Sequence, residues 1–311
     1  MPAPFPSSAT TPAQSRPAPS GSTPLPQGGS RFGPVALVVA AGVSVQFGAA
    51  LAVMIMPRAG AAGVVTLRLA AAALVLLAVC RPKVRGYTRA DWGTVVAFGV
   101  AMAGMNGLFY QSIDRIPLGP AVTLEVLGPL ALSVLVSRRL VNLLWAGLAL
   151  GGVVLLSGHG GGDFGFGSLD PLGAAFAVGA GAMWAAYIVF SARTGRRFPQ
   201  ADGLALAMAV AAVISLPLGV VEAGSDLLVP STLALGLGVA VLSSVLPYTL
   251  ELLALRRLPA PTFAILMSLE PAIAATAGFL VLHQAMSPLD ALAIALVIAA
   301  SMGAVQAQKR H

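Results

Sequence analysis

Three ionisable side chains lie deep within long apolar stretches of this 311-residue chain: Arg68, Glu125 and Glu270. A charge at the centre of a lipid bilayer costs roughly 2.5–3.5 kcal/mol even on the most lenient scale, so such a side chain faces a partner or an internal cavity. A guanidinium can bind a carboxylate through two parallel hydrogen bonds, and a buried carboxyl group can bind and release a proton. These residue types are therefore candidates for binding and moving a small polar solute.

The depths of these residues favour a common site. At a helical rise of about 1.5 Å per residue, Arg68 lies ~10 Å and Glu125 ~12 Å from one membrane surface, and Glu270 lies ~16 Å from the opposite surface. The similar depths favour an Arg68–Glu125 pair, for which two roles stay open. The guanidinium either forms a permanent ion pair that holds two helices together, or it receives a substrate carboxylate.

The two mid-membrane acids are expected to differ in role, although both are candidates for proton coupling. Burial opposes ionisation of a carboxyl group, and a nearby cation favours it. If Arg68 lies beside Glu125, that acid stays ionised, and Glu270 is the better proton carrier because its span holds no cation at matching depth. Glu251 lies near the end of its apolar stretch, where an interfacial or snorkelling acid is expected.

Neutral polar side chains accompany these groups within the apolar stretches or at their ends. They are candidates for lining a substrate cavity, and equally for hydrogen bonds between helices or for anchoring at the membrane surface. A shift of 138 residues places Gln46 on Trp184, which suggests similar depths in the two halves of the chain. The residues of this group are Gln46, Asn106, Tyr110, Gln111, Trp184 and Tyr187.

Local patterns that resemble catalytic motifs lack the context that their chemistry requires. Residues 160–165 match G-x-G-x-x-G, but no strand precedes them, as a dinucleotide-binding fold would require. Ser157 and His159 have no orienting acid, and no second aspartate at mid-membrane depth could form a protease dyad with Asp163. Cys80 is the only cysteine, and the histidines are far apart. We therefore predict no intrachain disulfide, no metal, no cofactor and no enzyme.

The elements that must hold these residues are ten apolar stretches, each close to the ~20 residues with which a helix crosses a bilayer. The chain is 57% hydrophobic and only 9% charged, whereas a soluble domain has about 25% charged residues. We predict an all-α membrane protein with ten transmembrane helices. The expected spans are 34–55, 61–80, 92–112, 117–137, 141–157, 169–191, 203–221, 231–254, 259–281 and 287–306.

Positive charge falls in every second gap between these spans. Arg58 and Arg115 lie in gaps on one side, and 15 of the 18 Lys and Arg residues lie on the other. The pattern describes a polytopic inner-type membrane protein, and the positive-inside rule predicts that both of its termini face the cytoplasm. Cations placed in pairs at helix ends argue against nucleic-acid binding despite the net charge of +7. The 15 cations are Arg16, Arg31, Arg81, Lys83, Arg85, Arg89, Arg138, Arg139, Arg193, Arg196, Arg197, Arg256, Arg257, Lys309 and Arg310.

Residues 1–33 are rich in Pro, Ser, Ala and Thr. A segment of this composition cannot support a packed core, so we expect a disordered cytoplasmic tail. No apolar region precedes residue 34, so a cleaved signal peptide is not expected.

An internal repeat is indicated by a shift of 142 residues, which places Pro117 on Pro259 and Pro129 on Pro271, with two leucines between them also in register. Ten spans give five to each half, and an odd number inverts the second copy relative to the first. Pro129 and Pro271 are expected to kink the middle of their spans, because proline removes a backbone hydrogen bond. Matching interruptions point to a binding site at the midplane, although such prolines can also shape packing alone.

Two stretches carry a family resemblance: IPLGPAVTLEVLGPLALSVLVSRR at 116–139 and the segment that begins SSVLPYTLELLALRRLPAPTFAILMSLEPAIAA at residue 243. They resemble the threonine/homoserine exporter group of the EamA, or drug/metabolite transporter, family. The resemblance implies two inverted five-helix EamA repeats, 34–157 and 169–306, with Arg68, Glu125 and Glu270 as the polar centre. Where relatives often have Leu-Gly-Glu at the end of span nine, this chain has Leu282, His283 and Gln284.

The resemblance also implies a secondary transporter that exports small amino acids or related metabolites of the threonine and homoserine type, driven by proton antiport. Its expected partners are a small-molecule substrate, protons and the lipid bilayer, and a homodimer stays open. Efflux of a purine, drug or nucleotide sugar is an alternative, because this fold serves many solutes. An intramembrane enzyme is disfavoured, because the spans hold no nucleophile–base set.

Overall fold

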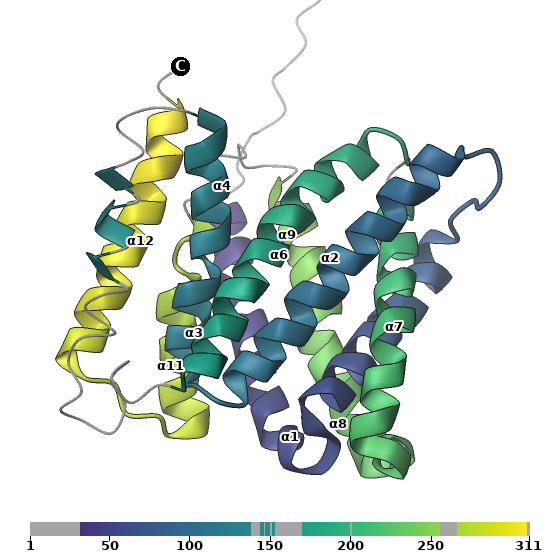
Figure 1. Cartoon of the computed structure of the whole chain (residues 1–311), viewed down its shortest axis with the longest axis horizontal. Helices are drawn as coiled ribbons and strands as arrows, with labels where there is room; N and C mark the ends of the chain where they lie inside the picture. Colours follow the sequence, from purple (N-terminus) through teal and green to yellow (C-terminus); the bar gives the residue numbers. More distant parts are fainter. Residues whose placement is uncertain are drawn as a thin grey trace, which may run out of the picture. The chain divides into compact units, whose positions relative to one another are not determined.

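The computed structural model describes residues 32–137, 144–145, 147–149, 151–152, 170–199, 201–255 and 266–309. All regular elements within these ranges are helices. They belong to one unit, which begins at Phe32 and is drawn in Figure 1. The tail expected at 1–33 lies almost wholly outside the described residues, and so does the start of the span expected at 259–281. The span expected at 141–157 is described only at 144–145, 147–149 and 151–152.

The helix α1 (Phe32–Cys80) is 49 residues long and contains both of the first two predicted spans. Its backbone leaves the helical conformation at Gly60, where φ is 66° and ψ is 167°. Glycine adopts a positive φ without the steric penalty that a Cβ atom brings. Pro57 precedes this point by three residues and weakens the helix further. Gly60 therefore separates two arms, each long enough to be a span.

The other helices place the polar residues of the third and fourth predicted spans and of the second half of the chain. They are α2 (Arg89–Ile113), α3 (Leu118–Glu125), α4 (Leu127–Ser137), α6 (Pro171–Gly195), α7 (Asp202–Ala223), the 3₁₀ helix η1 (Gly224–Leu228), α8 (Pro230–Ala240), the π-helix η2 (Val241–Val245), α9 (Leu246–Leu255), α11 (Glu270–Leu282) and α12 (Pro288–Lys309).

Five helices within the described ranges are long and apolar enough to cross a membrane, judged by length and composition. One of them is the two-armed α1, whose 48-residue apolar segment is longer than the ~20 residues that one crossing needs. Three further apolar helices are shorter. The described part of the chain is therefore that of a multi-pass membrane protein.

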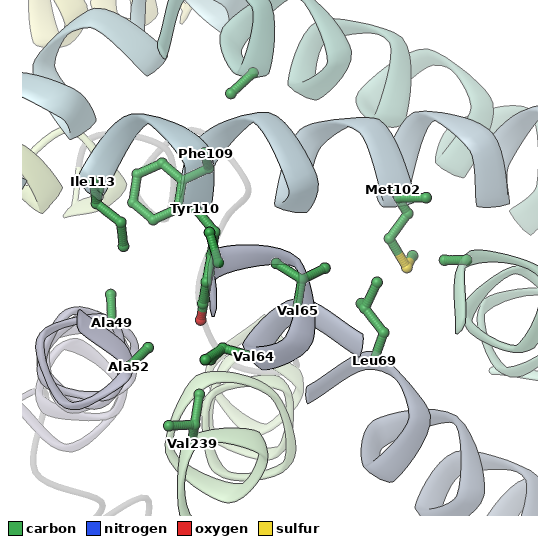
Figure 2. Packing of buried hydrophobic residues seen from close by; sticks show 14 of the residues in the cluster. Ala49, Ala52, Val64, Val65, Leu69, Met102, Phe109, Tyr110, Ile113 and Val239 are labelled. Carbon is green, nitrogen blue, oxygen red and sulfur yellow. The ribbon is translucent and has the colours of Figure 1, made fainter. Parts of the chain in front are cut away.

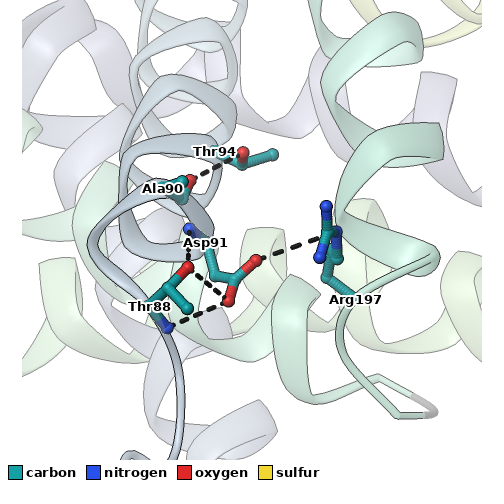
Figure 3. Close-up of polar contacts among 5 residues, drawn as sticks. All are labelled: Thr88, Ala90, Asp91, Thr94 and Arg197. Atoms are coloured by element: carbon teal, nitrogen blue, oxygen red, sulfur yellow. Dashed lines mark hydrogen bonds and ion pairs between the residues drawn. The ribbon is translucent and has the colours of Figure 1, made fainter.

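Short polar side chains define where helices begin. Thr88 caps α2 by accepting a hydrogen bond from the Asp91 N–H, and the Asp91 carboxylate accepts from the Thr88 N–H at 3.0 Å (Figure 3). This reciprocal arrangement is a capping box. The same carboxylate lies 3.8 Å from the Arg197 guanidinium, so the start of α2 is also tied to the connection between α6 and α7.

Small residues allow the helices to pack closely. α1 packs along α7, and α2 packs along α6. A Cβ atom at Gly219 would collide with Thr66, whose hydroxyl donates to the Ser215 carbonyl oxygen at 2.8 Å. Close approach at small residues, supplemented by hydrogen bonds between helices, is typical of membrane bundles.

Two helices are interrupted at positions 142 residues apart. α3 ends at Glu125 and α4 begins at Leu127, with Val126 in a turn between them. Residues 268–269 form a turn directly before α11. Each interruption lies within one helical turn before a proline, Pro129 or Pro271, whose missing N–H leaves the carbonyl four residues earlier without its helical donor. The breaks therefore lie at the two prolines from which the sequence predicts kinks.

The end of α11 suggests a stabilising substitution. His283 has φ 54° and ψ 31°, the left-handed conformation in which glycine usually ends a helix. We expect His283→Gly to raise the free energy of unfolding by about 0.5–1 kcal/mol, because it removes the steric cost of a Cβ atom there. Thermal unfolding in detergent micelles measures this. His283→Ala keeps the Cβ atom and is the control, and equal stability of the two variants would contradict the account.

Candidate functional site

Arg68 of α1 is held by three hydrogen bonds from its guanidinium. Nε donates to Ser244 Oγ at 3.3 Å, one terminal nitrogen donates to Tyr110 Oη at 3.1 Å, and the other donates to the Ser243 carbonyl oxygen at 2.9 Å. A guanidinium has five N–H donors. In the described part of the chain, one N–H on each terminal nitrogen is left without a partner.

Two of the three acceptors for Arg68 come from the π-helix η2, which interrupts the path from α8 to α9. π-helical turns are rare and are frequently found at functional sites. The first arm of α1 also binds this turn, since Ser44 Oγ donates to the Leu242 carbonyl oxygen at 2.6 Å. Gly48 permits this approach, because a Cβ atom there would collide with Ser243. The π-turn is thus held by both arms of α1.

Tyr110 places the third acceptor. Figure 2 shows its side chain pointing from α2 toward α1, with Val239 of α8 on the far side. Tyr110 is fully buried, and the Arg68 guanidinium carbon lies 5.5 Å from the centre of its ring. The ring therefore offers both a hydrogen bond and a cation–π contact to the same cation.

Glu125 does not form the ion pair with Arg68 that the sequence favours. The ion pairs between described residues are Arg115–Asp170 and Arg197–Asp91. Three of the guanidinium's N–H groups instead donate to Ser243, Ser244 and Tyr110. Glu125 is half-buried and stays within electrostatic range of Arg68 and of Glu270.

Glu125 and Glu270 lie on opposite sides of the two helix breaks. Glu125 is the last residue of α3, and Glu270 is the first residue of α11 and is 8% exposed. Glu251 in α9 is half-buried and lies within electrostatic range of Glu270. The structure therefore brings Arg68 and Glu125 near one another, and links Glu270 electrostatically to both Glu125 and Glu251.

The remaining predicted site residues have different surroundings. Asn106 donates to the Met102 carbonyl oxygen of its own helix at 2.9 Å, which is a local bond. Tyr187 packs its ring against Phe98 at 5.1 Å between centroids, and Trp184 is half-buried beside the same core. Gln46 is 3% exposed, and its Oε1 has no hydrogen-bond partner within the described ranges.

Sequence reasoning missed Ser243 and Ser244. Two adjacent serines in the middle of an apolar stretch, at 231–254, were the available signal. Serine is common where membrane helices pack closely, so these two residues did not suggest a binding role. The local sequence also gives no signal that predicts a π-turn. No group of His, Cys, Asp and Glu that could hold a metal ion occurs among the residues that the structure describes.

Comparisons with known proteins agree on one family. The profile of the EamA-like transporter family matches residues 171–306. The threonine/homoserine exporter RhtA of Escherichia coli K12 is 43% identical over 270 residues, which is 87% of this chain and 90% of the relative. The protein of the same name in Salmonella typhimurium LT2 is 43% identical over 278 residues, covering 89% and 93%.

A solved structure described only as "Crystal structure of protein" has the same fold. It aligns with a TM-score of 0.54 and 20% sequence identity, and covers 86% of this chain and 98% of the solved chain. At this identity the match speaks for the fold alone.

The surroundings of Arg68 give a stability prediction. We expect Tyr110→Phe to lower the free energy of unfolding by about 1–2 kcal/mol, because it removes a hydrogen bond to a charged group inside the protein. Tyr87→Phe is the matched control, since the Tyr87 ring stacks on Phe198 at 4.2 Å and a phenylalanine keeps that contact. Thermal unfolding in detergent compares the two, and equal losses would contradict the role of the hydroxyl.

Proposed function

The chain belongs to the EamA-like transporter family, and from this we propose that it is a membrane exporter of threonine, homoserine and amino acids of similar size. The observation that carries the proposal is the 43% identity to threonine/homoserine exporters over nearly the whole length of both chains. The polar centre around Arg68 supports it, because an amino acid must be bound by charged groups inside an otherwise apolar bundle.

Arg68 is proposed to bind the substrate carboxylate. The support is its guanidinium, held by three hydrogen bonds. Within the described residues one N–H on each terminal nitrogen has no partner, and two such N–H groups suit the two oxygens of a carboxylate. Glu125 lies within electrostatic range of Arg68 and is proposed to face the substrate ammonium group. Opposite charges at one site match the two charges of a zwitterionic amino acid.

Glu270 is proposed to carry the coupled proton, with Glu125 as the second acid of the coupling. In support, Glu270 is nearly fully buried at the start of α11, and within the described ranges it forms no ion pair. Its electrostatic neighbours are acids, Glu125 and Glu251. A group of acids shares protons more readily than a single acid beside a fixed cation.

The architecture is proposed to be ten transmembrane helices in two inverted repeats, 34–157 and 169–306, in the plasma membrane with both termini cytoplasmic. The helix breaks at Val126 and at 268–269 support the repeats, because they are 142 residues apart, which is the register of the proline pairs. The 15 cations on one side support the orientation. Gln46, Trp184 and Tyr187 are proposed to line the path between the repeats, while Asn106 serves packing.

The first test measures export directly. Proteoliposomes loaded with labelled threonine or homoserine are expected to exchange it for the unlabelled solute, and a purine nucleoside is expected not to exchange. Arg68→Lys should lower kcat/KM at least about tenfold, because lysine keeps the charge but loses the two-pronged geometry.

The control for this test is Arg196→Gln, which changes an exposed arginine at the end of α6. Its transport should equal that of the wild type. Exchange of the nucleoside instead of the amino acids would favour efflux of another solute class and would overturn the proposed substrate.

The second test concerns coupling. Acid outside and neutral pH inside should accelerate threonine efflux from the wild type, because inward proton flow then drives export. Glu270→Gln cannot carry a proton, so efflux should become independent of the pH gradient while counterflow exchange persists. Asp114→Asn alters an exposed acid at the end of α2 and should leave the acceleration intact. Wild-type acceleration in Glu270→Gln would rule out the proton role.

A further inference from the structure

We propose that Glu222 and Gln284 act together as a gate at one end of the bundle. Both side chains belong to the second half of the chain, and each binds the N-terminus of a helix in the first half. The gate rests on the proposed transport function, because a transporter must open this end to release or admit its solute. Neither Glu222 nor Gln284 belongs to the polar centre around Arg68.

Glu222 binds the start of the second arm of α1. Its Oε1 accepts from the Ala61 N–H at 3.0 Å, and its Oε2 accepts from the Ala62 N–H at 2.8 Å. The first N–H groups of a helix have no partners within the helix, and their positive end attracts a carboxylate. Gly60 leaves the space, since a Cβ atom there would collide with Glu222. Both carboxylate oxygens of Glu222 thus accept hydrogen bonds from backbone N–H groups about 160 residues away in the sequence.

Gln284 binds the start of α3 in the same manner. Its side-chain Oε1 accepts from the Leu118 N–H at 3.1 Å, and Leu118 is fully buried. The residue before it, Pro117, supplies no side-chain cap of its own. The turn at His283 positions Gln284, whose N–H donates to the Gly278 carbonyl oxygen at 3.1 Å. Gly278 in turn leaves the room for the glutamine oxygen.

The two contacts lie at the same end of the bundle. In Figure 1 the kink of α1, the junction of α7 with α8, and the facing ends of α3 and α11 all lie at the lower end, away from the C-terminus. Each cap comes from the C-terminal end of a helix that packs against its target: α7 against α1, and α11 against α3. Separation of the halves at this end must break both caps.

The chemistry of the caps suits a gate. The acceptors are side chains on the ends of helices, so they can exchange backbone partners for water when the end opens. Gln284 is uncharged, and therefore its cap does not change with pH over the physiological range.

Hydrogen exchange read by mass spectrometry tests the gate on the full chain in detergent. Glu222→Ala should speed amide exchange about tenfold at residues 61–66, whose first N–H groups Glu222 binds. If the two caps open together, exchange should also become faster at residues 118–122, which Glu222 does not contact. Gln284→Ala should have the reciprocal effect. If each cap only stabilises its own helix, the faster exchange will be confined to that helix, and this result would overturn the gate.

Two controls keep the outcome clear. Asp226→Asn alters an exposed acid four residues from Glu222 and should change exchange at neither helix start. Glu222→Gln and Gln284→Glu keep an acceptor oxygen and should change exchange less than the alanine variants, which gives a readout even if an alanine variant fails to fold. The measurement needs no substrate, so a failure of the amino-acid assignment leaves it interpretable.

Discussion

Lipid offers no hydrogen-bond partners, so every polar group at depth must find its partner inside the protein. Arg68 shows how this requirement organises the structure. Its guanidinium links the second arm of α1 to α2 and to the π-turn η2. Ser44, from the first arm of α1, binds the same π-turn. The cation thus joins four helical segments, and among the described residues one N–H on each of its terminal nitrogens has no partner.

The same requirement explains where helices can break. A proline leaves one carbonyl without its helical donor, and this is tolerated at depth only where the protein or a cavity surrounds it. The carbonyl of Glu125 lies against Gly181 of α6, where a Cβ atom would collide with it. The interruption before Pro129 is therefore covered by protein, and it places the Glu125 side chain at a helix end near the centre of the bundle.

Local features of the sequence predicted local features of the structure. The span expected at 92–112 is the helix Arg89–Ile113, and the span expected at 203–221 is the helix Asp202–Ala223, because hydrophobic length is read directly along the chain. The partners of Arg68 were not predictable in this way. They depend on which helix faces meet across more than 170 residues to Ser243 and Ser244, and similar depth alone made Glu125 the favoured partner. The positive φ angles of Gly60 and His283 could not be predicted from the sequence either, since backbone angles at helix ends depend on packing.

The meeting of α4 and α6 at Gly128 and Gly181 has a mechanical consequence. A Cβ atom at Gly128 would collide with the Gly181 backbone, and one at Gly181 would collide with the Glu125 carbonyl. Because neither glycine carries a side chain, the two helices touch backbone to backbone at this point. A contact of this kind leaves no rotamer at either glycine that would have to change if the helices tilted about it. A methyl group added at either glycine would push the two helices apart at this point. The separation of the helix axes would then increase with distance from the crossing.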